Sequence, residues 1–117
     1  MEDFEELISD DIVTIVVNIT RGTINESKRL GEILDGKIAS GCKKLIVDLA
    51  VCEYVDSTFI GTLLVRYKKL KEKKGNLKLI IPDSPKGVMF TVTYTLRLFD
   101  IYKSRKEAIE SFQFEEN

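Results

Sequence analysis

Three polar residues at the boundary between a predicted strand and a predicted helix have side chains that could do chemistry. In the segment Val47–Leu64, VDLAVCEYVDSTFIGTLL, apolar residues lead into Asp56, Ser57 and Thr58, and an amphipathic pattern follows. A helix N-terminus presents unpaired N–H groups and roughly half a positive charge, and both favour an anion. The Ser57 hydroxyl is therefore well placed to carry a phosphate.

A simpler interpretation is that Ser57 only caps the helix, as serine commonly does at such a boundary. Two observations favour a functional role. Three candidate caps, Asp56, Ser57 and Thr58, stand in a row where one would suffice. The boundary also follows an apparently central strand, and α/β sheets place their functional residues at the carboxyl ends of such strands.

The composition is that of one globular domain spanning residues 1–117, with 44% hydrophobic and 32% charged residues. The 18 basic and 19 acidic residues give a net charge of −1, which does not favour nucleic acid as a direct partner. The acidic start MEDFEELISDD does not resemble a signal peptide, and no apolar run is long enough to span a membrane. We therefore predict a cytoplasmic protein without a membrane partner.

The chain contains no histidine, which removes the usual general base, the Ser-His-Asp triad and most zinc sites. Cys42 and Cys52 are predicted to be reduced, partly buried thiols. No glycine-rich phosphate loop of the nucleotide-binding type is present. We expect no catalytic residues, no metal and no cofactor, and hence a protein that is not an enzyme.

Hydrophobic periodicity predicts alternating strands and helices. Apolar and β-branched runs predict four strands, at Phe4–Ile8, Ile12–Ile19, Leu45–Leu49 and Leu77–Ile81. Helical spacing predicts crossover helices after Asn25, taken as an N-cap, and after Ser57. The order β-β-α-β-α-β-α-α then predicts an α/β sandwich with a mixed, mostly parallel sheet of four to five strands and about four helices.

Signals for helix ends complete this pattern. Gly41 and Gly75 are predicted to end the first two helices, and Ser84-Pro85 is predicted to start a third. Ser104, followed three residues later by Glu107, is predicted to cap the last helix. The lysine-rich run Lys68–Lys74 is interpreted as the solvated end of the second helix, although such a run could also bind acidic partners.

At this point the sequence resembles the STAS-domain family, the anti-sigma factor antagonists of bacteria. Asp56–Gly61 (DSTFIG) is similar to the family's D-S-[ST]-G-x-G pattern, and Leu63–Lys68 (LLVRYK) to the helix that continues it. Gly75–Pro85 (GNLKLIIPDSP) and Leu96–Ile109 (LRLFDIYKSRKEAI) resemble the family's later strand and its closing segment. Gly22–Asn25 (GTIN) stands where the family usually has G-x-L-D, so the match covers nearly the whole domain.

The resemblance implies a single-domain STAS-like α/β fold and a binding switch that regulates transcription. Ser57 matches the serine that a partner anti-sigma factor, itself a serine protein kinase, phosphorylates and that a serine phosphatase restores. The free protein is expected to be a monomer or a weak dimer. The expected partner-binding residues are Asn25, Asp56, Ser57, Thr58, Phe59, Gly61 and Thr62.

Two residues depart from the family pattern. Phe59 replaces a glycine and is expected to place an aromatic ring beside the phosphate site, and Asn25 replaces an aspartate. The loss of that negative charge should make a nearby phosphate easier to hold. The alternative hypothesis is a STAS-type scaffold or sensor module in a larger signalling assembly, in which Ser57 is only a helix cap.

Overall fold

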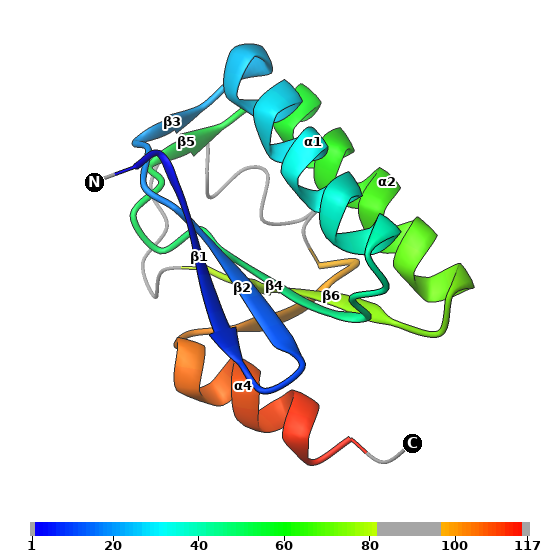
Figure 1. The fold of residues 1–117 in the computed structure, drawn as a ribbon. Coiled ribbons are helices and arrows are strands. Elements are labelled where there is room, and N and C mark those ends of the chain that lie inside the picture. Colours follow the sequence, from blue (N-terminus) through cyan, green and yellow to red (C-terminus); the bar gives the residue numbers. More distant parts are fainter. Residues whose placement is uncertain (1, 82–96, 116–117) are drawn as a thin grey trace.

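A five-stranded mixed sheet forms the centre of the protein, whose computed structural model describes residues 2–81 and 97–115. The strands lie in the order β1-β2-β4-β6-β7 (Figure 1). Strand β1 pairs antiparallel with β2, and the other three pairings are parallel. Their bounds are β1 Phe4–Ser9, β2 Ile12–Val17, β4 Lys44–Asp48, β6 Asn76–Ile80 and β7 Asp100–Tyr102. The predicted mixed, mostly parallel sheet is confirmed.

Helices cover both faces of this sheet. α1 (Ile24–Ala39) and α2 (Ser57–Glu72) lie side by side on one face, and α4 (Arg105–Gln113) lies on the other (Figure 1). About four helices were predicted, and the described residues contain three. The helix predicted to begin at Ser84-Pro85 falls outside the described residues. None of the helices in the described part of the chain is both long and apolar enough to cross a membrane.

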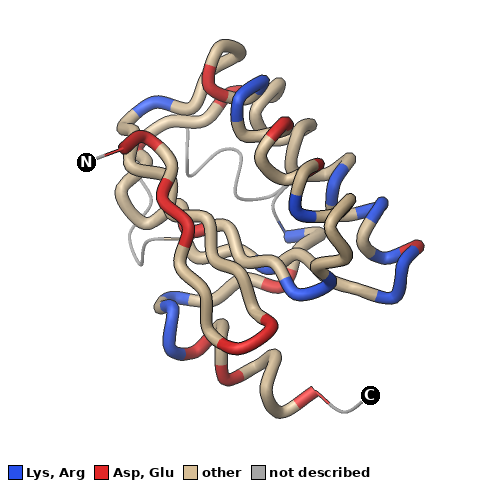
Figure 2. The backbone as a smooth tube through the Cα atoms, viewed as in Figure 1, with Lys and Arg blue, Asp and Glu red and all other residues tan. Residues whose placement is uncertain are grey.

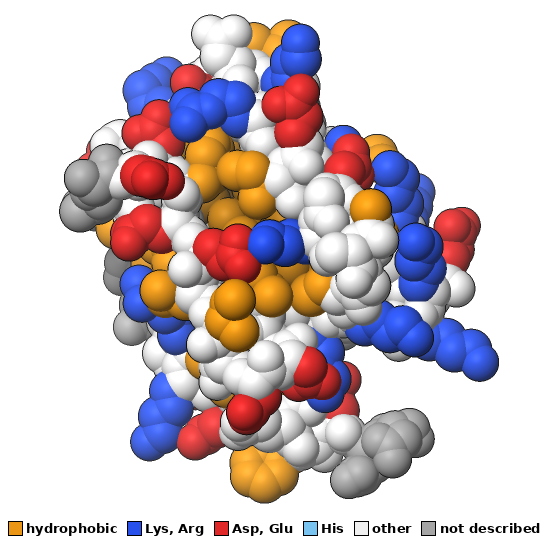
Figure 3. All heavy atoms as spheres, in the orientation of Figure 1, with side chains coloured by type: hydrophobic (Ala, Val, Ile, Leu, Met, Phe, Trp, Pro, Cys, Tyr) orange, Lys and Arg blue, Asp and Glu red, His pale blue; other side chains and the backbone are white. Residues whose placement is uncertain are grey.

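Alternating side chains on the strands build two cores. On β4, Val47 packs into the larger core beneath α1 and α2, whereas Ile46 packs into the smaller core beneath α4. The period of two along a strand produces this division. At the edge of the sheet, hydrophobic side chains are visible between β1 and α1 (Figure 3), where Lys37 forms an ion pair with Glu6.

The sequence-based prediction missed the three-residue strand β7 and two even shorter strands. β3 (Arg21–Gly22) and β5 (Tyr54–Val55) pair in parallel outside the main sheet. Two residues are too few to show any hydrophobic periodicity, so such strands leave no clear pattern in the sequence. Each of them leads directly into a helix, and together they determine where α1 and α2 begin.

The predicted N-cap of α1 is wrong. Thr23 is the N-cap, with an extended backbone, and its N–H donates to a Glu26 carboxylate oxygen at 3.0 Å. Asn25 lies within the first turn of the helix instead. The T-x-x-E pattern of a capping box was present in the sequence and outweighs the general preference of asparagine for caps. The predicted cap of α4 is confirmed, because Ser104 Oγ accepts a hydrogen bond from the Glu107 N–H at 3.1 Å.

Candidate functional site

The short strands bring the N-termini of α1 and α2 together at one end of the molecule (Figure 1). Gly22 pairs with Val55, and the Asp56 N–H donates to the Gly22 carbonyl at 2.9 Å. The N-caps, Thr23 and Asp56, each come one residue after this pair. Both helices therefore direct the positive ends of their dipoles toward the same surface.

Asp56, and not Ser57, caps α2. The Asp56 backbone is extended, and its Oδ1 accepts a hydrogen bond from the Phe59 N–H at 2.8 Å. Ser57 is the first residue of the helix and is exposed. Its hydroxyl forms no hydrogen bond with any described residue. The interpretation that Ser57 is only a helix cap is therefore wrong, and its hydroxyl is accessible for chemistry.

The exposed side of α2 near its start carries small side chains, and we call it the Ser57 face: Ser57, Thr58, Gly61, Thr62 and Val65. Ser57 and Thr58 are exposed, and Gly61 and Thr62 are partly exposed. Residues four positions apart lie on one face of a helix, so Gly61 follows Ser57 and Thr62 follows Thr58. These four residues are among those predicted to bind a partner, and the helix brings them onto one surface.

Phe59 lies beneath this surface and is fully buried. A Cβ atom built on Gly22 would lie 2.8 Å from a carbon of the Phe59 ring, so the aromatic ring packs directly against the backbone of β3. The aromatic ring expected beside the phosphate site points into the core instead. In this structure Phe59 can act on a partner only through the position of its neighbours.

The first turn of α1 contributes residues at the neighbouring helix start. Asn25 is exposed there, as expected for a binding residue. Ile24 precedes it and is 63% exposed, and Val65 on the Ser57 face is 48% exposed. The sequence analysis did not include either apolar residue in the site. Val65 falls outside the spacing of the apolar positions that the helix buries, and this pattern could have indicated that Val65 is exposed. Exposed apolar side chains beside small polar ones are a composition suited to protein contact.

A charged side chain also lies at this end of the molecule. Arg21 stacks over the Tyr54 ring at 4.3 Å from its centroid, which holds a cation on the short two-stranded sheet. No group of three or more potential metal ligands occurs among the described residues. What the arrangement offers is an accessible hydroxyl at the positive end of a 16-residue helix.

The two cysteines have no disulfide between them, and both thiols are free. Burial raises the pKa of the Cys52 thiol to about 12, and it also raises the pKa of the half-buried Cys42 thiol. Reactive cysteines have lowered pKa values. The free thiols and their burial agree with the prediction of reduced, partly buried cysteines.

Comparison with known proteins identifies a family and several relatives. The model of the STAS domain matches residues 3–108. BtrV of Bordetella bronchiseptica, named as a candidate anti-sigma factor antagonist, is 23% identical over 110 residues, which is 92% of this chain and 95% of that protein.

Three solved structures have a similar fold. An anti-sigma factor antagonist from Mycobacterium paratuberculosis has a TM-score of 0.78 at 16% identity, and the match covers 92% of this chain and 91% of that one. Unphosphorylated SpoIIAA, an anti-sigma factor antagonist, has a TM-score of 0.75 at 16% identity, and the match covers 96% of this chain and 99% of that one. Phosphorylated SpoIIAA of Bacillus has a TM-score of 0.71 at 18% identity, and the match covers 93% of this chain and 98% of that one.

Proposed function

The chain belongs to the STAS domain family, and from that premise we propose that it is an anti-sigma factor antagonist that acts as a non-catalytic binding switch. In its unmodified form, the Ser57 face together with Asn25 and Asp56 docks on an anti-sigma factor that is also a serine kinase. The captured factor no longer holds its sigma factor. Phosphorylation of Ser57 weakens docking, and a serine phosphatase restores it.

The capping of α2 by Asp56 is the observation that carries this proposal. Because the Asp56 carboxylate satisfies the Phe59 N–H, the helix does not need the Ser57 hydroxyl. A kinase can therefore modify Ser57 without removing a hydrogen bond that stabilises the fold. Its exposure at the start of the helix makes the hydroxyl accessible to an approaching active site.

The charge of a phosphate explains how the switch would work. A phosphate on Ser57 adds about −1.5 to −2 charges at neutral pH. The adjacent N–H groups and the helix dipole stabilise that charge in the free protein. In a complex, the same charge would lie among small and apolar side chains, and its desolvation would oppose docking.

No change of fold is needed for this mechanism. The similarity of this chain to SpoIIAA in both its unphosphorylated and phosphorylated forms supports a switch that operates within one fold. The names of the Bordetella and Mycobacterium relatives support an anti-sigma factor as the class of partner.

A pull-down from a lysate of the source cell tests the proposal. The baits are the wild type, Ser57→Asp and Gln113→Glu, with captured proteins identified by mass spectrometry. Gln113→Glu is the matched control, since it adds one negative charge on the exposed end of α4, away from the Ser57 face. We expect an ATP-binding kinase with the wild type and the control, and its loss with Ser57→Asp.

Identical captures by all three baits would contradict the switch and would favour a scaffold or sensor module. Capture of no kinase by the wild type would contradict the proposed class of partner. Phosphorylation gives a second measurement, because the captured kinase with Mg-ATP should modify the wild type but not Ser57→Ala, which keeps Thr58.

A further inference from the structure

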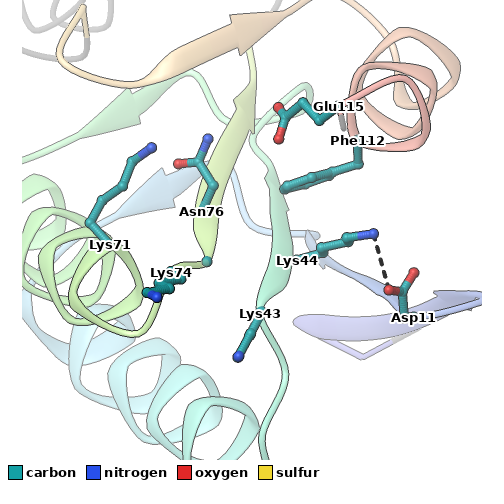
Figure 4. Close-up of a pocket in the computed structure, with 9 residues that line it drawn as sticks. Asp11, Lys43, Lys44, Lys71, Lys74, Asn76, Phe112 and Glu115 are labelled. Carbon is teal, nitrogen blue, oxygen red and sulfur yellow. Dashed lines mark ion pairs between the residues drawn. The ribbon is translucent and has the colours of Figure 1, made fainter. Parts of the chain in front are cut away.

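A basic pocket lies at the end of the molecule opposite Ser57. It has a volume of about 420 Å³ and is formed where the end of α2, the starts of β4 and β6, the β1–β2 turn and the end of α4 meet (Figure 4). Ser57 begins α2, whereas Lys71 and Lys74 of the pocket lie at and beyond its C-terminus. The proposed switch uses none of the residues in this pocket.

Four lysines line the pocket, two from each of two chain segments. Lys43 and Lys44 lie at the start of β4, and Lys71 and Lys74 lie at the end of α2. Positions of Lys and Arg, coloured blue, also gather along this end of α2 in Figure 2. Two carboxylates, Asp11 and Glu115, complete the charged lining.

The backbone holds the two lysine-bearing segments against each other. The Asn76 N–H donates to the Lys43 carbonyl oxygen at 2.8 Å. A Cβ atom built on Gly75 would lie only 2.5 Å from that same oxygen, so only glycine permits this approach. The fold therefore fixes the backbone positions of the lysines on either side as neighbours.

The positive charge of the pocket is only partly neutralised. Lys44 pairs with Asp11 at 3.1 Å, and Glu115 pairs with Lys78, which lies beneath α4. Lys43 and Lys74 have no ion pair or hydrogen bond to their side chains among the described residues. Like charges held together repel each other, and a bound anion would relieve that repulsion.

The helix dipole accounts for only some of these lysines. Lys69 and Lys71 lie in the last turn of α2, where cations complement the negative end of the helix. Lys43 is not on a helix, and the sheet pairing fixes its position. Solvation of a helix end therefore does not explain why Lys43 and Lys74 share a pocket.

We propose that this pocket binds the phosphate group of a small ligand, with Lys43, Lys71 and Lys74 as the cations that contact it. The volume falls in the range of small-molecule sites. The carboxylates of Asp11 and Glu115 would repel a long polyanion laid across the pocket, such as nucleic acid or an anionic membrane. They would accept hydrogen bonds from hydroxyl groups of a compact ligand.

Titration of the 15N-labelled full chain with inorganic pyrophosphate, followed by NMR, tests this proposal. We expect saturable shifts of the Gly75 and Asn76 amide signals. The double variant Lys43→Gln/Lys74→Gln should bind pyrophosphate about tenfold more weakly than the wild type. The control Lys68→Gln/Lys73→Gln removes the same charge from exposed positions outside the pocket and should retain the affinity.

The outcomes separate a site from general attraction to positive charge. Equal weakening in the two double variants, or shifts that never saturate, would overturn the proposal. Binding to anionic lipid vesicles without binding to pyrophosphate would overturn it as well. Ser57→Asp should leave pyrophosphate binding unchanged, so a failure of the switch and a failure of this pocket can be told apart.

Discussion

At the scale of single residues, the proposed function depends on two neighbouring residues with different roles: Asp56 caps α2, and Ser57 is free to be modified. The two adjacent residues could each cap a helix, and the fold gives the cap to Asp56. A side chain that stabilises a helix cannot be modified without a loss of stability. Ser57 has no such role, and we therefore expect its substitutions to change binding rather than stability.

The first prediction compares the two residues directly. Asp56→Ala should lower the free energy of unfolding by about 1 kcal/mol, because the Phe59 N–H loses its acceptor. Ser57→Ala should change it by less than about 0.5 kcal/mol. Urea denaturation measures both values, and Asp56→Asn serves as a control that retains a capping side chain. A larger loss for Ser57→Ala would show that Ser57 is the cap.

The second prediction concerns the contact between Gly22 and Phe59. Gly22→Ala should destabilise the protein by about 1–3 kcal/mol, because its new methyl group meets the buried aromatic ring. In a Phe59→Leu background the penalty should be smaller, since the ring is gone. A double-mutant cycle measures this coupling, and strictly additive effects would contradict the contact.

The sequence predicted these residue roles only in part. It identified Asp56, Ser57 and Thr58 as candidate caps, but it could not choose among them because all three types cap helices. It placed Phe59 beside the phosphate site, since a residue in the first helical turn can point outward or inward. The inward direction follows from the position of Gly22, which depends on a pairing between segments 33 residues apart, Gly22 and Val55.

At the scale of elements, the side-by-side packing of α1 and α2 keeps their N-termini in register. Arg66 on α2 donates from Nε and Nη2 to the two carboxylate oxygens of Asp35 on α1, at 3.1 and 2.7 Å. Lys69 adds a contact to Asp35 at 3.3 Å. Together with β3 and β5, this clamp aligns the helix starts that form the candidate site.

A pH dependence of stability follows from this clamp. Hydrogen bonding to Arg66 lowers the pKa of Asp35 below its ordinary value of 3.8. The clamp's contribution is therefore complete above that value and is lost as the pH falls through the lower pKa of the folded state. Because the Asp35 side chain is 40% exposed, we expect its ion pair to contribute at most about 1 kcal/mol to the free energy of unfolding.

Urea denaturation between pH 6 and pH 3, in steps of about one pH unit, measures this dependence. The wild type should lose more stability than Asp35→Asn over the acidic part of the range. Parallel pH profiles for the two proteins would show that Asp35 does not contribute to acid sensitivity.

The sequence predicted the long elements and missed the short ones. β-branched runs revealed β2 and β4, and helical spacing revealed α1 and α2. β3, β5 and the three-residue β7 are stabilised by pairing with distant strands, which local periodicity cannot reveal. The candidate site depends on β3 and β5, so its geometry could be known only from the fold.

At the scale of the whole molecule, one sheet separates two cores. The proposed switch lies where α1 and α2 begin, and the proposed phosphate pocket lies where α2 ends. Beneath α4, the Nζ atom of the fully buried Lys78 donates a hydrogen bond to Ser111 Oγ at 2.8 Å. The same atom lies 4.1 Å from the centroid of the Phe112 ring. Both cores share the strands of the sheet, so neither should unfold alone.

Residues 1–117 should therefore unfold as one cooperative domain. The chain has four tyrosines and no tryptophan, so tyrosine fluorescence and far-UV circular dichroism provide two probes of urea denaturation. Tyr67 packs against the larger core and Tyr102 against the smaller one. We expect coincident transitions. Two separate steps would show that the two faces of the sheet unfold independently.

The central claim, that charge at Ser57 controls docking, is tested most directly by the affinity of the captured partner for four proteins. Isothermal titration calorimetry would compare the wild type, Ser57→Ala, Ser57→Asp and the control Gln113→Glu. We predict wild-type affinity for Ser57→Ala and Gln113→Glu, and at least about tenfold weaker binding for Ser57→Asp. Equal affinity for all four proteins, or failure of Ser57→Ala to bind, would contradict the claim.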